Sequence, residues 1–324
     1  MPQKVEISSK TIIFAVFFVI ALQLIWLVRE LIFALFLAFI CMSALKPAVN
    51  FFVRSRIPRP LSALLVFLSA LIIFSIMVSV IIPPFIQETL LFIKSLPTLI
   101  QQTTPQLSNF VDVSSFTSFL PDITQNFFKV ISSIFSNLVF IVSVLFFTFY
   151  FLLEEHFLKN FLDKFIDEKK TGDIVAIVSK VERRMGAWVW GEVILMTVIG
   201  VMTYIGLTIL QVKYILPLAV LAGLLEVVPI LGPTLSAIPA FFVALSSSWA
   251  LGIMTVGLYI VIQQLENNLV VPYVMKKAVG LNPIMTLIAL SVGGKLGGLL
   301  GILLSVPIAL LIETLMVEFA QLKK

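Results

Sequence analysis

The stretch Gly223-Leu-Leu-Glu-Val-Val-Pro-Ile-Leu-Gly-Pro-Thr-Leu-Ser-Ala-Ile-Pro239 places one carboxylate, Glu226, in sequence that is otherwise apolar enough to lie inside a bilayer. An ionisable side chain in hydrocarbon costs at least ~2.5 kcal/mol, so it usually faces a cavity or a partner. Pro229, Gly232 and Pro233 interrupt a helix, and the backbone groups that they free must be buried in protein or line water. The stretch therefore predicts a broken membrane helix at the place where a transport site is expected.

The composition extends this prediction to the whole chain. The sequence is 60% hydrophobic and 12% charged, with a mean hydropathy of +1.12, whereas soluble domains are about 25% charged. The net charge is +5, and the basic residues lie in loops between apolar runs. In such loops they determine the orientation of the spans in the membrane, so no nucleic acid is expected as a partner. These features indicate a polytopic protein of the lipid bilayer.

Several kinds of chemistry have no sequence motif here. Cys41 is the single cysteine, so no intrachain disulfide is possible and neither a thiol enzyme nor a cysteine metal site is indicated. The sequence contains no Walker loop and no cluster with metal-ligand spacing, so ATP-driven transport by this chain alone is unsupported. We expect no enzyme activity, no metal and no cofactor, and any coupling would use H⁺ or Na⁺.

Apolar runs near the ~20 residues of a spanning helix indicate the spans. They occur at 11–28, 31–45, 61–84, 130–153, 193–212 and about 250–270, and the second could extend past Lys46. The first run is too long for a signal core and no cleavage site follows it, so it is expected to be retained. The basic loop 46–60 is expected in the cytoplasm, which places the N-terminus there too, and the later spans leave Lys323 and Lys324 on the same side. We expect a prokaryotic inner-membrane location.

The polar segments complete a division into 1–84, 85–129, 130–153, 154–190 and 191–318. Segment 85–129 is expected outside the cell, with short amphipathic helices that form a cap or a lid. Segment 154–190 is expected inside, as two amphipathic helices separated at Thr171-Gly172, with His156 as a solvated residue. The remaining segment, 191–318, is the expected transport core.

Two interrupted hairpins are predicted in this core, near 215–247 and 284–312. Their expected breaks are at Pro229, Gly232, Pro233 and Pro239, and at Gly293, Gly294, Gly297 and Pro307. Paired broken segments are a pointer to a transporter site, although the similarity between these two is short enough to arise by chance. The predicted fold is all-α, with about six full spans and two broken or re-entrant hairpins, which amounts to roughly seven to eight spans.

A polar row, Gln263-Gln-Leu-Glu-Asn-Asn268, supplies the other candidate binding residues. Helical spacing puts Gln263, Glu266 and Asn267 on one face, where a carboxylate and amides could converge on a polar ligand or cation. The same row could instead be a solvated helix end. Lys295 could pair with Glu226 or Glu266 as a structural ion pair, or bind an anion.

Three further acids receive structural interpretations. Glu192 is expected to mark an interfacial helix start, where its charge suits the helix dipole. Glu313 and Glu318 are expected near the cytoplasmic surface. The candidate substrate or ion site is therefore Glu226, Gln263, Glu266, Asn267, Asn268 and Lys295.

The C-terminal half also resembles the autoinducer-2 exporter (AI-2E) family of prokaryotic permeases. The resemblance rests on Trp190-Gly-Glu192, Glu226-Val-Val-Pro-Ile-Leu-Gly-Pro233 with Pro239-Ala240, Gln264-Leu-Glu-Asn-Asn268 with Val271-Pro272, Val279-Gly-Leu-Asn-Pro283, and Gly293-Gly with Gly297, Gly301 and Pro307. It implies an inner-membrane transporter, since members are linked to export of autoinducer-2 and others to sodium or lithium/proton antiport. Members usually have Gly-Gln where this chain has Gly191-Glu192.

The hypotheses from the sequence belong to different classes. The first is a secondary transporter, exporting a small polar solute or exchanging a monovalent cation. The second is a membrane scaffold that binds a cytoplasmic partner through 154–190, and the third is a passive channel. A homo-oligomer is compatible with the small residues of 293–301, as is packing within one chain.

Overall fold

The computed structural model describes residues 9–103, 137–228, 231–275 and 283–322, and these residues contain helices and no strand. Pro229 and most of the 85–129 segment therefore lie outside the described residues. The helices are α1 Ser9–Leu27, α2 Arg29–Arg54, α3 Arg59–Thr103, α5 Leu138–Leu153, α6 Phe157–Leu162, α7 Glu168–Ile209, α8 Ile215–Leu225, α9 Leu231–Leu245, α10 Trp249–Leu265, α11 Val271–Met275 and α12 Pro283–Leu322. A π-helical turn, Glu266–Val270, joins α10 to α11. The all-α prediction is confirmed.

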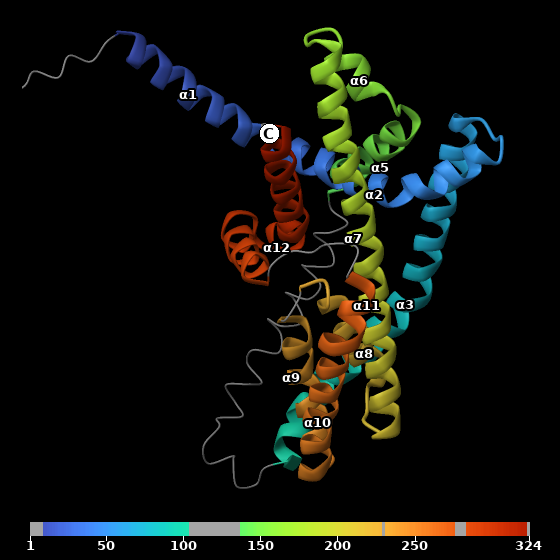
Figure 1. Ribbon diagram of the computed structural model, residues 1–324. Coiled ribbons are helices and arrows are strands. Elements are labelled where there is room, and N and C mark those ends of the chain that lie inside the picture. Colours follow the sequence, from blue (N-terminus) through green and yellow to red (C-terminus); the bar gives the residue numbers. More distant parts are fainter. Residues whose placement is uncertain (1–8, 104–136, 229–230, 276–282, 323–324) are drawn as a thin grey trace, which may run out of the picture.

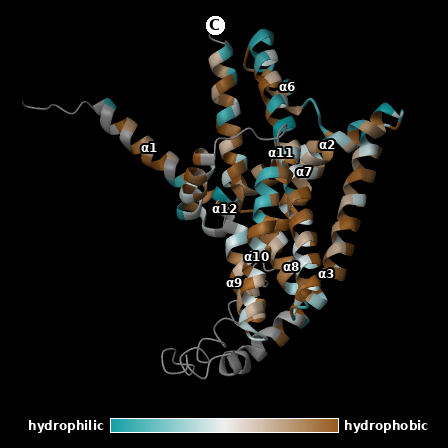
Figure 2. Ribbon diagram, turned by 60° about the horizontal axis from the view of Figure 1, so that its bottom comes forward, coloured by the Kyte–Doolittle hydropathy of each residue, from teal (hydrophilic) through white to brown (hydrophobic). Residues whose placement is uncertain are grey.

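Within the described residues, five segments are long and apolar enough to cross a membrane: Arg29–Arg54, Arg59–Gln87, Glu168–Ile209, Trp249–Met275 and Gly301–Gln321. Shorter apolar helices, including α5, α8 and α9, accompany them. Figure 2 shows hydrophobic residues along α3, while hydrophilic residues gather around α6. The polytopic architecture expected from the composition is confirmed.

Helix α2 is longer than the apolar run 31–45 that predicted it. It continues through Lys46 and Pro47 to Arg54, because Lys46 has a partner on another helix: its Nζ lies 2.5 Å from the Glu182 carboxylate on α7. Most of the predicted loop 46–60 is therefore helical. The possible extension past Lys46 is confirmed.

Helix α7 joins two elements that were predicted separately. The second amphipathic helix of segment 154–190 and the span 193–212 form one helix of 42 residues. The predicted break at Thr171-Gly172 is wrong, since the chain leaves the helix at 163–167 instead, between α6 and α7. The acidic residues Asp167 and Glu168 favour a helix start because their charge suits the N-terminal dipole.

Helix α3 likewise continues beyond its predicted end at 84, and reaches Thr103. The short surface helices expected from residue 85 onward are, up to Thr103, part of this one helix. Prolines inside a helix remove single hydrogen bonds and bend it, but do not always end it.

Both interrupted segments contain two helical arms. Helices α8 and α9 pack on each other, with Gly232 against the Leu225 carbonyl, so that a side chain at 232 would clash. The second segment, α12, reverses at Gly298 (φ 57°, ψ −136°), a left-handed conformation that favours glycine. Gly293 then packs against Gly301 within the chain, which accounts for the small-residue run without a second copy.

The breaks do not lie at every predicted residue. Helix α9 continues through Pro239, and α12 continues through Pro307. The reversal of α12 is at Gly298 rather than at Gly293, Gly294 or Gly297. A proline or glycine is compatible with a membrane helix when neighbouring groups satisfy the freed backbone, so residue type alone does not locate the break.

One core joins the second half of α7 to α8, α9 and α10. Figure 1 shows α7 running the length of the molecule with these three helices gathered beside its C-terminal half. The cluster contains Ile199 and Leu207 from α7, Leu218 and Ala222 from α8, Ala240 and Val243 from α9, and Tyr259 and Ile262 from α10. This four-helix core holds the candidate site.

Candidate functional site

Glu226 and Glu266 form a buried carboxyl pair. Their side chains face each other at hydrogen-bonding range, and the two residues are only 2% and 3% exposed. Glu192, at 5% exposure, lies close enough to interact electrostatically with both. Three carboxyls from three parts of the chain thus lie in the core of a membrane protein.

Glycines bring the Glu226 end of α8 against α7. A side chain at Gly223, one turn before Glu226, would come within 2.7 Å of the Met196 carbonyl oxygen. Helix α8 ends at Leu225. The Glu226 amide still donates to the Ala222 carbonyl at 3.2 Å, and tighter three-residue bonds from Val227 and Val228 follow it. The carboxyl of Glu226 therefore leaves the helix end directly beside α7.

The π-helical turn Glu266–Val270 places the second carboxyl. Such turns are rare and frequently mark functional sites, because an extra residue widens one turn of the helix. Gln263, one turn earlier, donates from Nε2 to Oε2 of Glu266 at 3.1 Å. The turn aims Glu266 inward, whereas the polar residues that follow it are exposed.

The electrostatics of the pair differ from those of an ordinary ion pair. The described ion pairs involve Lys46, Arg59, Lys180 and Arg184, and none of them includes Glu192, Glu226 or Glu266. One oxygen of Glu192 and one of Glu226 also lack a hydrogen-bond partner among the described residues. A carboxyl pair of this kind is stable when a shared proton or a bound cation offsets its charge.

Within the described part of the chain, no three potential metal-ligating side chains converge. Glu192 thus flanks the pair rather than completing a ligand set.

The structure brings together some of the predicted site residues and separates others. Glu226, Gln263 and Glu266 meet. Asn267 and Asn268 are exposed, and the Asn268 amide donates to the Gln264 backbone carbonyl at 2.8 Å. The prediction placed Asn267 on the Glu266 face by regular α-helical spacing, and the π-helical turn changes that spacing.

Lys295 also lies apart from the pair. It is exposed on the first arm of α12, and it makes no ion pair with Glu226 or Glu266 among the residues that the structure describes. The possible Lys295–Glu ion pair is therefore not formed in this conformation.

The interpretation of Glu192 as an interfacial helix start is wrong, because this residue lies in the middle of α7 and is buried. The sequence does contain a signal for it. Buried positions recur at three- and four-residue spacing along α7: Ile177, Val181, Met185, Trp188, Glu192, Leu195, Ile199 and Thr203. This continuous stripe puts Glu192 on the buried face, once 168–209 is treated as one helix.

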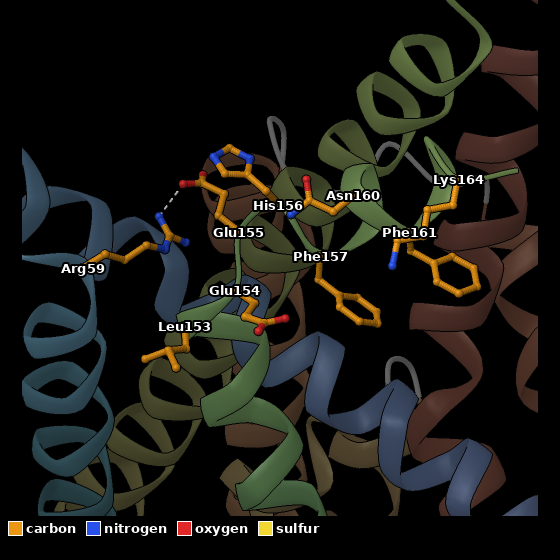
Figure 3. Close-up of a pocket in the computed structure, with 9 residues that line it drawn as sticks. All are labelled: Arg59, Leu153, Glu154, Glu155, His156, Phe157, Asn160, Phe161 and Lys164. Atoms are coloured by element: carbon orange, nitrogen blue, oxygen red, sulfur yellow. Dashed lines mark hydrogen bonds and ion pairs between the residues drawn. The ribbon is translucent and has the colours of Figure 1, made fainter. Parts of the chain in front are cut away.

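Cavities in the described part of the chain also lie away from the carboxyl pair, and two of them have lining residues that bear on function. A cavity of about 380 Å³ at the α5–α6 junction contains the Arg59–Glu155 ion pair (2.5 Å) and His156, as Figure 3 shows. An apolar cavity of about 660 Å³ lies between α7 and 269–274, next to Gly191. The first lies at the charged end of the molecule, which is the region of the ion pairs of Lys46, Arg59, Lys180 and Arg184. The second lies beside Gly191 and so adjoins the region of the carboxyls.

A multi-pass helical bundle with buried carboxyls where short helices meet has the architecture of a membrane transport protein. Comparison with known proteins identifies the family. A family model described as "AI-2E family transporter" matches residues 12–321, so the chain belongs to that family, and the resemblance found in the sequence is confirmed.

Several proteins with similar sequences are named as transport proteins or permeases. "Putative transport protein YueF" of Bacillus subtilis is 26% identical over 321 residues, covering 92% of this chain and 86% of that protein. "Putative transport protein YrrI" of the same organism is 24% identical over 148 residues, or 46% of this chain and 42% of its own. "Putative permease PerM" of Escherichia coli K12 is 23% identical over 184 residues, or 55% and 51%.

Proposed function

We propose that this protein is a secondary transporter in which the Glu226–Glu266 pair carries the coupling ion, H⁺ or Na⁺. The proposal rests on two buried carboxyls that face each other. Neither has a basic partner among the described ion pairs. Buried acids in membrane spans are commonly parts of proton relays and ion pathways. The transported molecule is a small polar solute, moved out of the cell across the inner membrane of a prokaryote, with both termini in the cytoplasm.

Sodium or lithium/proton antiport is the second candidate, and one observation favours it. The amides of Asn267 and Asn268, which would suit an uncharged polyhydroxylated solute such as autoinducer-2, are exposed, whereas the pair is buried. The carboxyl oxygens of Glu226 and Glu266, which suit a small cation, remain at the site.

Alternating access would use the two hairpins. We propose that α8–α9 and the two arms of α12 are re-entrant elements that move relative to the long helix α7. The short lengths of α8 and α9, 11 and 15 residues, support this, because neither reaches across a bilayer alone.

The test is Glu226→Gln in proteoliposomes with imposed proton and sodium gradients and a panel of solutes. The amide keeps the shape of the side chain and cannot release a proton, so we expect gradient-driven flux to be abolished while circular dichroism stays unchanged. Glu154→Gln, at an exposed position on the α5–α6 link, is the matched control and should transport normally. Wild-type flux in Glu226→Gln would overturn the role of the pair.

The scaffold hypothesis keeps one supporting observation. Phe157, Phe161 and Phe165 are exposed in a row beside the charged cavity of Figure 3. If this row binds a cytoplasmic partner, Phe157→Ser with Phe161→Ser would remove function while Glu226→Gln would not. A passive channel would instead show flux that neither saturates nor depends on an ion gradient.

A further inference from the structure

Four hydroxyl side chains lie in the same core as the carboxyl pair. They are Thr203 on α7, Ser236 on α9, and Thr255 and Tyr259 on α10. Thr203, Ser236 and Thr255 are 0% exposed, and Tyr259 is 6% exposed. The proposed transport function does not account for them.

Their spacing places them in line with the carboxyls. On α10, Thr255, Tyr259 and Glu266 are separated by four and seven residues, and on α7, Glu192 and Thr203 are separated by eleven, so each set lies on one helix face. The hydroxyls extend from the pair toward the end of the bundle where α7 ends, at Ile209, and α10 begins, at Trp249. At 1.5 Å per residue, Thr255 lies about 16 Å along the axis from Glu266.

Helices α7, α9 and α10 share the core that encloses these hydroxyls. A side chain at Gly206 would lie 2.7 Å from a methyl group of Leu258, so α7 and α10 touch at the level of Tyr259. The Tyr259 hydroxyl faces Ser236 on α9. The line therefore passes between three helices rather than along the surface of one.

The buried threonines Thr203 and Thr255 differ from the exposed threonines of α7. Thr197 and Thr208, exposed on α7, each donate to the carbonyl four residues earlier at 2.7 Å. Thr203 Oγ1 and Thr255 Oγ1 have no hydrogen-bond partner among the described residues. Ser236 Oγ donates to the Pro233 carbonyl at 3.0 Å and faces the Tyr259 hydroxyl. A buried hydroxyl without a partner is costly, and in native proteins such groups usually bind ordered water.

We propose that Thr203, Ser236, Thr255 and Tyr259 form a hydrated polar file that carries protons between the Glu226–Glu266 pair and the end of the bundle at Ile209 and Trp249. Each hydroxyl both donates and accepts, so a proton that enters at one end of the file is matched by one that leaves at the other. The proton-carrying role rests on the proposed function of the pair, whereas the hydration of the file does not.

The first experiment removes hydroxyls at nearly constant size. Thr203→Val with Thr255→Val is compared with Thr197→Val with Thr208→Val in proteoliposomes that contain a pH-sensitive dye and receive a sodium jump. We expect proton movement to fall at least about tenfold in the first pair, equivalent to ~1.4 kcal/mol on the barrier. The control pair should keep the wild-type rate. If the Thr203→Val, Thr255→Val double variant moved protons at the wild-type rate while Glu226→Gln lost flux, the proposed hydroxyl file would be wrong and the proposed role of the carboxyl pair would stand.

The second experiment tests hydration independently of transport. In a Cys41→Ser background, which removes the single cysteine, Thr203→Cys is compared with Val201→Cys, which is 52% exposed on the outer surface of α7. Iodoacetamide reacts with the thiolate, and a thiol ionises in water but not in lipid, so Thr203→Cys should react at least about tenfold faster. Equal, slow labelling of both cysteines would show that the file is not hydrated and would overturn it. This result does not depend on whether Glu226→Gln changes flux.

Discussion

The carboxylates at the charged end of the molecule and those in the four-helix core have opposite kinds of partner. At the charged end, Glu182 pairs with Lys46, and Glu313 accepts from Arg184 at 2.7 Å. In the core, Glu226 faces Glu266 instead. Carboxylates with basic partners fasten helices together, whereas carboxyls that face each other leave a place for a mobile proton or cation.

Converting the core pair into an ion pair should have the largest effect. Glu226→Lys would place a cation beside Glu266 and remove the need for a proton or Na⁺. We expect the protein to remain folded in detergent, with gradient-driven flux lost across the whole pH range, because a permanent partner occupies the site. Flux measured from pH 5 to 9 tests this. Residual pH-dependent flux would show that the pair is not the coupling site.

Separating the helices that hold the pair should have an intermediate effect. Gly223→Val adds a side chain where only 2.7 Å separates the new carbon from the Met196 carbonyl, so α8 must move from α7. We expect a loss of ~1–3 kcal/mol in unfolding free energy, together with reduced transport. Thermal unfolding in detergent measures the stability.

Gly257→Ala on α10 is the matched control for Gly223→Val. An added carbon there meets nothing within 4 Å, so stability should be unchanged or slightly higher. If both glycine variants unfold at the same temperature, close contact at Gly223 does not set the geometry of the site.

The sequence predicts the core better than it predicts the boundaries within it. Hydropathy gives the membrane class and most of the spans because the bilayer requires long apolar helices. It fails at α2 and α7, where charged residues such as Lys46 and Glu182 are satisfied by each other across helices. Partners in space convert apparent loops into continuous helix.

The candidate site was predictable in part for the same reason. An acid beside prolines in apolar sequence is a local signal, so Glu226 and Glu266 could be singled out. The π-helical turn that buries Glu266 and exposes Asn267 has no local signal. The burial of Glu192 follows only from a continuous helix through 190, because the stripe of buried positions from Ile177 to Thr203 crosses the predicted boundary between a cytoplasmic segment and a span.

Removing an ion pair at the charged end should have the smallest effect, and this effect should be on stability rather than on ion coupling. Lys46→Met keeps much of the apolar stem but leaves Glu182 without its partner, and both side chains are mostly covered, at 21% and 16% exposure. We expect a loss of ~1–2 kcal/mol, between the values for exposed and buried pairs. Lys180→Met, which removes the Lys180–Glu318 pair, should cost less because that lysine is 42% exposed and solvent already screens it.

Salt separates this effect from the role of the core. Raising ionic strength from 0.01 to 1 M shortens the Debye length from about 30 to 3 Å, so the stability difference between wild type and Lys180→Met should shrink. The difference for Lys46→Met should shrink less, because Lys46 is 21% exposed whereas Lys180 is 42% exposed. Both variants should keep the ion dependence of flux that Glu226→Gln loses. If Lys46→Met instead abolished coupling while stability stayed unchanged, the ion pair between α2 and α7 would be part of the transport mechanism, and the division between fastening and mobile charges would not hold.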